Sequence, residues 1–161
     1  WTAPLFHAAD AEKLKNFIEK QETDEQALLV SAVMLNIQRY FDPQKYRLLL
    51  HFCRTEHTKV RARAMTAVLN DPTACRPGSP YAYHYVIEAL IACGMRDEAR
   101  EQLLEYWGGM VGRGADTFWE VYDPMDDCKS PYGFYPVNSY CHAWSCTPVY
   151  FINTYKDIFQ R

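Results

Sequence analysis

The sequence predicts a mainly α-helical protein built from antiparallel helical hairpins. Apolar residues recur at helical spacing over most of the chain, and capping residues with prolines stand where helices should begin. A glycine at position 94 stands where a left-handed residue ends a helix. With 161 residues and 48% apolar content, the chain has enough apolar material to bury a core, so we expect it to be folded.

Four helices are expected before residue 70. Their apolar positions at helical spacing are Leu14, Phe17 and Ile18, then Leu28 to Ile37, then Leu48 to Phe52, and finally Val60, Ala64, Ala67 and Val68. Thr23 stands before two acidic residues and a glutamine, a pattern typical of a helix start. Phe41-Asp42-Pro43 ends one helix and begins another, since Asp caps and proline suits the first helical position. The result is two short hairpins.

Residues 24–69 are similar to HEAT-like helical repeats. The stripe of small residues from Val60 to Val68 suits the close helix packing of such a repeat stack. One hypothesis for this segment is therefore a helical-repeat interaction module that binds a protein partner through residues 24–69.

A linker is expected at residues 71–80, which contain three prolines and one glycine. This divides the chain into a helical-hairpin segment at 1–70, the linker, and a second segment at 81–161. Of the 24 aromatic residues, 7 lie in residues 1–75 and 17 in residues 76–161. The abrupt change raises the hypothesis that the chain joins pieces of two unrelated proteins.

The second segment should open with one more hairpin. Ser79 and Pro80 predict the start of a helix over 81–93, and a second helix should run from Asp97 to about Gly108. Residues 108–137 are rich in Gly, Pro, Asp and aromatic residues without a clear period, so we expect long loops there. A single closing helix is expected from Val149 to Phe159.

Charge and hydropathy exclude two classes of partner. The net charge of −3 and pI near 5.9 give no broad basic field for nucleic acid. No run of 18 apolar residues exists, so no membrane partner is expected. Because the chain begins at Trp1 rather than Met, the localisation stays open.

The six cysteines have irregular spacing, which does not indicate a disulfide framework, and we expect most of them to be buried thiols. Cys128, Cys141, His142 and Cys146 were weighed as zinc ligands. They contain no Cys-x-x-Cys pair, so neither a metal site nor a cofactor is expected.

One candidate site stands out in residues 114–144. Glu120 follows Phe118 and Trp119 in a glycine-rich loop, where apolar walls would raise the pKa of its carboxyl toward the range useful for a general base. The rings of Trp119, Trp144, Tyr122 and Tyr135 offer flat faces to a sugar, whereas Asp123, Asn138, Ser139 and His142 offer polar groups to its hydroxyls. The alternative is that the rings form core and Glu120 has no catalytic role.

Taken together, these residues resemble the C-terminal part of the catalytic domain of glycoside hydrolase family 78, the α-L-rhamnosidases. Residues 114–120 look like the family's Gly-Ala-Thr-Thr-Phe-Trp-Glu stretch, with Asp116 where the family often has Thr. Asn138-Ser139 followed by His142 looks like its Asn-Ser-x-x-His. The resemblance covers residues 78–160. It implies a piece of an (α/α)6 six-hairpin toroid with long active-site loops.

The resemblance further implies that Glu120 is the general base of an inverting hydrolysis and that His142 contacts a terminal rhamnose-type sugar. The family's general acid lies upstream, and nothing in residues 1–77 reproduces that segment. We therefore expect a fragment of an inverting glycoside hydrolase that is inactive as an isolated chain. A non-catalytic carbohydrate-binding remnant is the remaining alternative.

Overall fold

The computed structural model describes residues 7–39, 42–126, 128–134 and 137–161. Over these ranges it contains eight α-helices, two short 3-10 helices and no β-strand, which confirms the predicted fold class. The chain divides into two compact units, Trp1–Cys75 (unit 1) and Arg76–Arg161 (unit 2). None of the helices in the described ranges is long and apolar enough to span a bilayer.

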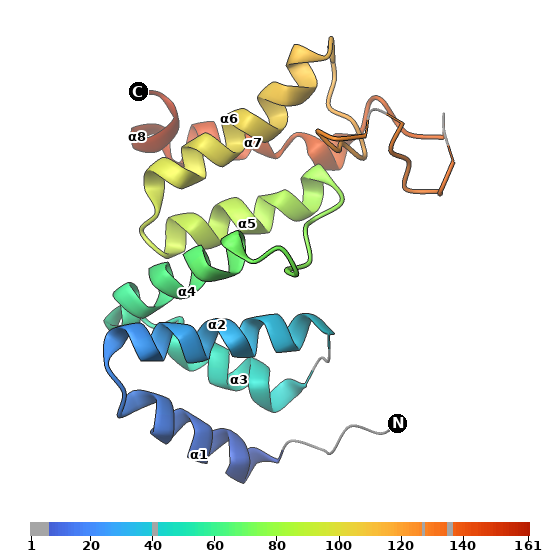
Figure 1. Ribbon diagram of the computed structural model, residues 1–161. Coiled ribbons are helices and arrows are strands. Elements are labelled where there is room, and N and C mark those ends of the chain that lie inside the picture. Colours follow the sequence, from blue (N-terminus) through green and yellow to red (C-terminus); the bar gives the residue numbers. More distant parts are fainter. Residues whose placement is uncertain (1–6, 40–41, 127, 135–136) are drawn as a thin grey trace. The chain divides into compact units, whose positions relative to one another are not determined.

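Unit 1 contains the four predicted α-helices and one short 3-10 turn (Figure 1). They are α1 (Ala8–Glu19), α2 (Thr23–Arg39), α3 (Pro43–Phe52), η1 (Thr55–His57) and α4 (Thr58–Asn70). Asp42 caps α3 as predicted, since its carboxylate accepts hydrogen bonds from the backbone N–H groups of Gln44 at 2.8 Å and Lys45 at 3.2 Å. Phe41, part of the same predicted helix boundary, lies outside the described residues.

The core of unit 1 gathers residues from all four α-helices. Its buried members are Ile18, Ala27, Val30, Leu48, Phe52, Val60 and Ala64. α2 packs most extensively against α4, where Val60 and Ala64 present small side chains. Burial of these apolar surfaces is the main force that holds the two hairpins together.

Unit 2 opens with a helical hairpin, α5 (Pro80–Ala92) and α6 (Arg96–Gly112), and continues with η2 (Ala143–Ser145), α7 (Thr147–Thr154) and α8 (Lys156–Phe159). Ser79 caps α5, accepting from the N–H of Ala82 at 3.4 Å. Gly94 ends the helix with a φ of 77°, and the N–H of Met95 donates to the carbonyl of Leu90 at 2.9 Å. This is a Schellman motif, which allows a three-residue turn into α6.

The prediction that α6 ends near Gly108 was wrong, because the helix continues to Gly112. Met110 is fully buried in the extension, which contributes apolar burial that offsets the low helix propensity of glycine. Gly109 has a packing reason as well: a Cβ atom there would collide with the hydroxyl of Tyr122. The aromatic loop that follows α6 folds back against this glycine.

The single closing helix predicted over residues 149–159 was also wrong, because α7 and α8 are separated at Tyr155. Its backbone angles, φ −116° and ψ 57°, lie outside the helical region. The Tyr155 hydroxyl donates to the carboxylate of Glu88 on α5 at 3.2 Å. The break turns α8 so that fully buried Ile158 packs within unit 2.

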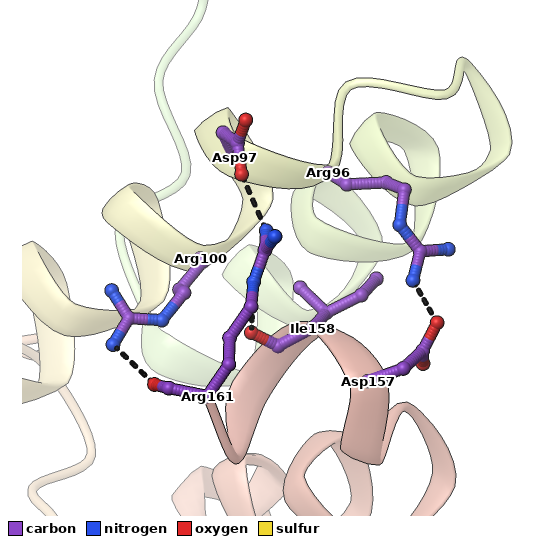
Figure 2. A network of polar contacts seen from close by, with 6 residues as sticks. All are labelled: Arg96, Asp97, Arg100, Asp157, Ile158 and Arg161. Atoms are coloured by element: carbon purple, nitrogen blue, oxygen red, sulfur yellow. Dashed lines mark hydrogen bonds and ion pairs between the residues drawn. The ribbon is translucent and has the colours of Figure 1, made fainter.

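A network of ion pairs joins α8 and the C-terminal residue to the start of α6 (Figure 2). Arg96 pairs with Asp157, Arg161 pairs with Asp97, and Arg100 donates to the main-chain oxygen of Arg161 at 3.3 Å. Ile158 lies among these groups in the close-up. The charged groups therefore surround the point where α8 inserts its buried side chain.

The expectation that most cysteines are buried was wrong. Cys53, Cys75, Cys128, Cys141 and Cys146 are exposed, and Cys93 is half-buried. Cys53, Cys128, Cys141 and Cys146 are free thiols. Larger apolar side chains fill the cores of both units, so the folding of the chain does not depend on cysteine burial.

Candidate functional site

Two loop segments that are distant in the sequence lie side by side in unit 2. The backbone N–H of Glu120 donates to the carbonyl of Ser139 at 2.8 Å, and the N–H of His142 donates to the carbonyl of Phe118 at 2.8 Å. Successive bonds connect earlier residues of one segment with later residues of the other, so the segments run antiparallel. We call residues 117–121 and 138–142 the paired loops.

Side chains reinforce the pairing at both ends. The Thr117 hydroxyl donates to the carbonyl of Tyr140, and the Asn138 amide donates to the carbonyl of Val121 at 3.2 Å. The two motifs that carried the family resemblance are thus brought into direct contact. The positions of the two motifs in the sequence do not by themselves predict this contact.

The helices of unit 2 anchor the paired loops through buried hydrogen bonds. The Trp107 indole on α6 donates to the carbonyl of Ser145 at 2.9 Å, and the fully buried Ser145 hydroxyl donates to the carbonyl of Trp119 at 2.8 Å. Each bond satisfies a backbone acceptor that would otherwise lose its partner on leaving water. Trp119, one of the four predicted rings, is therefore linked through Ser145 to α6.

A second anchor follows the paired loops. The Tyr106 hydroxyl donates to the carbonyl of Tyr122 at 2.9 Å, and Tyr83 on α5 stacks on Tyr106 with ring centroids 3.8 Å apart. Burial raises the pKa of the Tyr106 hydroxyl well above its usual value of 10.0, since it disfavours the phenolate. Tyr106 therefore remains a neutral hydrogen-bond donor at neutral pH.

Arg113, just after α6, fixes the position of the Tyr122 ring. Its guanidinium donates to the Tyr122 hydroxyl and to the carbonyl of Pro124, and it lies 5.2 Å from the centroid of the Tyr122 ring. Gly109 leaves the space that this hydroxyl requires. Arg113 was not predicted as a site residue, because no residue pattern reveals which arginine will reach a ring nine positions away.

Glu120 is half-buried, and its carboxylate is oriented by two donors. The N–H of Ser139 donates to Oε2 at 3.2 Å, and the hydroxyl of exposed Tyr132 donates to Oε1 at 3.4 Å. Together with the backbone bond to Ser139, these contacts hold the carboxylate on the edge of the paired loops. Tyr132 was another residue that the sequence reasoning missed.

Two hollows flank the paired loops. One of about 310 Å³ is lined by nine residues, namely Arg113, Trp119, Val121, Tyr122, Asp123, Asp126, Lys129, Asn138 and Tyr140. Four of its lining residues were predicted to bind a sugar, namely Trp119, Tyr122, Asp123 and Asn138. Asp123 lies 3.8 Å from the ammonium of Lys129, and Asn138 Oδ1 is a buried acceptor without a partner in the described part of the chain. An entering hydroxyl donor would satisfy that acceptor.

The second hollow, of about 480 Å³, contains His142 together with Asp116, Thr117, Phe118 and both Cys141 and Cys146. The structure therefore separates His142 from the residues of the first hollow. Glu120 is not among the residues that line either of these two hollows. Glu120 belongs to the paired loops, which contribute lining residues to both hollows.

Trp144 is 69% exposed and lines neither of the two hollows described. Its ring lies 5.8 Å from that of His142 and 5.6 Å from that of Tyr81 on α5. It forms an aromatic rim next to His142. Tyr135, the remaining predicted ring, lies outside the described residues.

Comparison with known proteins shows a likeness to a rhamnosidase. No protein-family model matches the chain, and no curated protein sequence does. Among solved structures, the chain is similar to a rhamnosidase from Klebsiella oxytoca with rhamnose bound, with 30% identity and a TM-score of 0.56. The match covers 83% of this chain and 34% of that protein, so this chain spans about a third of the rhamnosidase.

The match extends into both units of the chain. Unit 1 comprises residues 1–75 and unit 2 comprises residues 76–161, so each unit is shorter than the 83% of the chain that the match covers. The likeness therefore includes part of unit 1 as well as unit 2, which contains the paired loops. This does not fit the hypothesis that the chain joins pieces of two unrelated proteins.

Proposed function

We propose that the chain is part of the catalytic domain of an inverting α-L-rhamnosidase-like glycoside hydrolase, with Glu120 as its general base. The pairing of residues 117–121 with 138–142 carries the proposal, because it joins the two motifs that resemble the family's catalytic stretch. The likeness to a rhamnosidase at 30% identity supports the same assignment. Because the match also covers part of unit 1, it supports our assignment of both units to the same kind of domain in preference to a separate protein-interaction module.

In this proposal Glu120 takes a proton from a water molecule, and the water attacks the anomeric carbon from the face opposite the leaving group. The two donors on the carboxylate, Ser139 N–H and the Tyr132 hydroxyl, keep an oxygen directed at that water. The leaving group departs with a proton from a general acid, which in this proposal lies outside residues 1–161. The product would be the β-anomer.

The flanking groups suit a sugar ring. Trp119 would offer its face to the C–H side of the ring, and Asp123 with Asn138 would bind hydroxyls in the 310 Å³ hollow. His142, with Trp144 beside it, lines the other hollow, so its proposed contact requires a ligand that extends past the edge of the paired loops. A terminal rhamnose-type sugar is the proposed ligand.

A substrate whose leaving group needs no protonation tests the base without the absent acid. We expect the chain to hydrolyse α-L-rhamnosyl fluoride slowly and 4-methylphenyl α-L-rhamnoside not at all. NMR should detect β-L-rhamnose as the first product. Glu120→Gln should reduce fluoride hydrolysis by about 10²- to 10⁴-fold, the usual contribution of a general base.

Glu101→Gln is the matched control, since Glu101 is an exposed acid on α6 away from the paired loops. It should leave the rate unchanged. Fluoride hydrolysis that is equal in wild type and Glu120→Gln would exclude Glu120 as the base. Binding of L-rhamnose without any hydrolysis would instead identify a non-catalytic carbohydrate-binding remnant.

A further inference from the structure

We propose that unit 1 binds a divalent first-row transition-metal ion, such as Zn²⁺, through Glu19, His51 and His57. The Glu19 carboxylate and one ring nitrogen of each histidine all lie within 4.8 Å of one another. The three residues come from α1, α3 and η1, so only the fold brings them together. The site uses no residue of the proposed sugar site and stands independently of the proposed function.

The ligand types match such an ion. Imidazole nitrogen and carboxylate oxygen are common ligands of Zn²⁺, and two histidines with one glutamate form a known three-residue zinc set that leaves a position for water. In the protein without metal, Glu19 Oε1 lies 2.6 Å from Nε2 of His51, a hydrogen-bond distance. An ion would replace the hydrogen bond of that pair.

The backbone around the cluster also favours a cation. Glu19 is the last residue of α1 and His51 lies in the last turn of α3, and the C-terminal end of a helix dipole carries partial negative charge. The two helices pack against each other within unit 1. The negative ends of two helices therefore lie close to the three ligand atoms.

A buried phenyl ring positions both imidazoles. Phe52 is 1% exposed, and its ring centroid lies 5.1 Å from that of His51 and 5.1 Å from that of His57. The two imidazole centroids are 5.2 Å apart. Because Phe52 belongs to the core of unit 1, the rings are held near each other before any ion arrives, which lowers the entropy cost of binding.

Modest side-chain rotations complete the geometry. Ligand atoms about 2.0 to 2.2 Å from a tetrahedral zinc ion lie roughly 3.3 to 3.6 Å from one another. The present separations, from 2.6 Å to at most 4.8 Å, bracket that range. His57 also lines a hollow of about 340 Å³ together with Glu56 and Lys59.

Calorimetric titration of the chain with ZnCl₂ tests the proposal. Its thiols should first be alkylated with iodoacetamide, because five of the six cysteines are exposed and thiolates bind zinc. We expect one ion per chain. The variants Glu19→Gln, His51→Gln and His57→Gln should each weaken binding by at least about tenfold, since even outer-shell changes have effects of that size.

His7→Gln and Glu12→Gln are the matched controls, because both residues belong to unit 1 and stand outside the cluster. They should bind zinc as the wild type does. Circular dichroism of each variant checks that the helices are intact, and Glu19→Gln keeps the size of the side chain. Absence of binding by the alkylated wild type, or binding unchanged in Glu19→Gln and His51→Gln, would overturn the proposal.

Discussion

Glu120 and Ser139 are joined by two hydrogen bonds. The N–H of Glu120 donates to the carbonyl of Ser139 at 2.8 Å, and the N–H of Ser139 donates to the carboxylate of Glu120 at 3.2 Å. One residue thus fixes both the backbone and the side chain of the proposed base. This arrangement links the integrity of the paired loops to the orientation of the carboxylate.

Ser139→Pro should therefore disrupt the site. Proline removes the N–H that Glu120 accepts from, so the carboxylate loses a donor and unit 2 should lose roughly 1 to 3 kcal/mol of stability. Urea unfolding monitored by tryptophan fluorescence measures this loss, since Trp107, Trp119 and Trp144 all lie in unit 2. Ser139→Ala keeps the backbone donor and should behave as the wild type. Equal midpoints for both variants would contradict the role assigned to the backbone.

Two adjacent glycines of α6 should respond oppositely to the same change. Gly109→Ala places a Cβ against the Tyr122 hydroxyl and should destabilise unit 2 by about 1 to 3 kcal/mol. At Gly108→Ala the new methyl group meets nothing within 4 Å, so higher helix propensity should stabilise by up to about 1 kcal/mol. The midpoints of urea unfolding of the two variants, compared with that of the wild type, should shift in opposite directions. A stabilising Gly109→Ala would mean that Tyr122 does not lie against α6.

The C-terminal network of Figure 2 should matter less than the apolar residue within it. Ile158 is fully buried, and Ile158→Ala should cost about 2 to 5 kcal/mol through lost contacts and a cavity. Asp157→Asn removes only an exposed ion pair with Arg96 and should cost less than about 1 kcal/mol. Thermal unfolding of both variants provides the comparison. A larger effect for Asp157→Asn would show that α8 is held mainly by charge.

Stability should fall at alkaline pH because of buried and paired tyrosines. Burial, with the Glu88 carboxylate nearby, raises the pKa of Tyr155 from 10.0 to about 12. The unfolded chain then releases this proton at lower pH than the folded chain, so the stabilisation is complete below pH 10 and is lost as pH rises toward about 12. Tyr106 acts in the same direction.

Urea midpoints measured from pH 9 to pH 12 should therefore decline, and Tyr155→Phe should make the decline less steep. Tyr46→Phe, a change on α3 in unit 1, is the control and should leave the slope for unit 2 unchanged. A slope that is the same in wild type and Tyr155→Phe would contradict the assignment to Tyr155.

The local signals in the sequence predicted the helices well. Asp42, Ser79 and Gly94 each act through their own backbone neighbours, so their effect is visible without a fold. The two wrong boundaries arise where distant partners intervene. α6 continues past Gly108, where Met110 is buried and Tyr122 packs on Gly109, and the last helix breaks at Tyr155, whose hydroxyl donates to Glu88.

The candidate site shows the same division. The stretch at 114–120 and the Asn-Ser-x-x-His at 138–142 were identified from the residues, yet only the tertiary structure brings them into contact and separates His142 from the hollow of Trp119, Asp123 and Asn138. The catalytic role of Glu120 stays a prediction. The Glu19, His51 and His57 cluster was not foreseen, because its members are 32 and 6 positions apart and share no motif.

By itself, the sequence determined where most helices begin and which residue types are suited to binding a sugar, because capping, periodicity and side-chain chemistry are local properties. Only the tertiary structure decided which loops pair, which rings remain exposed and which ligand atoms converge. Those outcomes depend on hydrogen bonds and apolar contacts between residues far apart in the chain, and these form only when the helices pack.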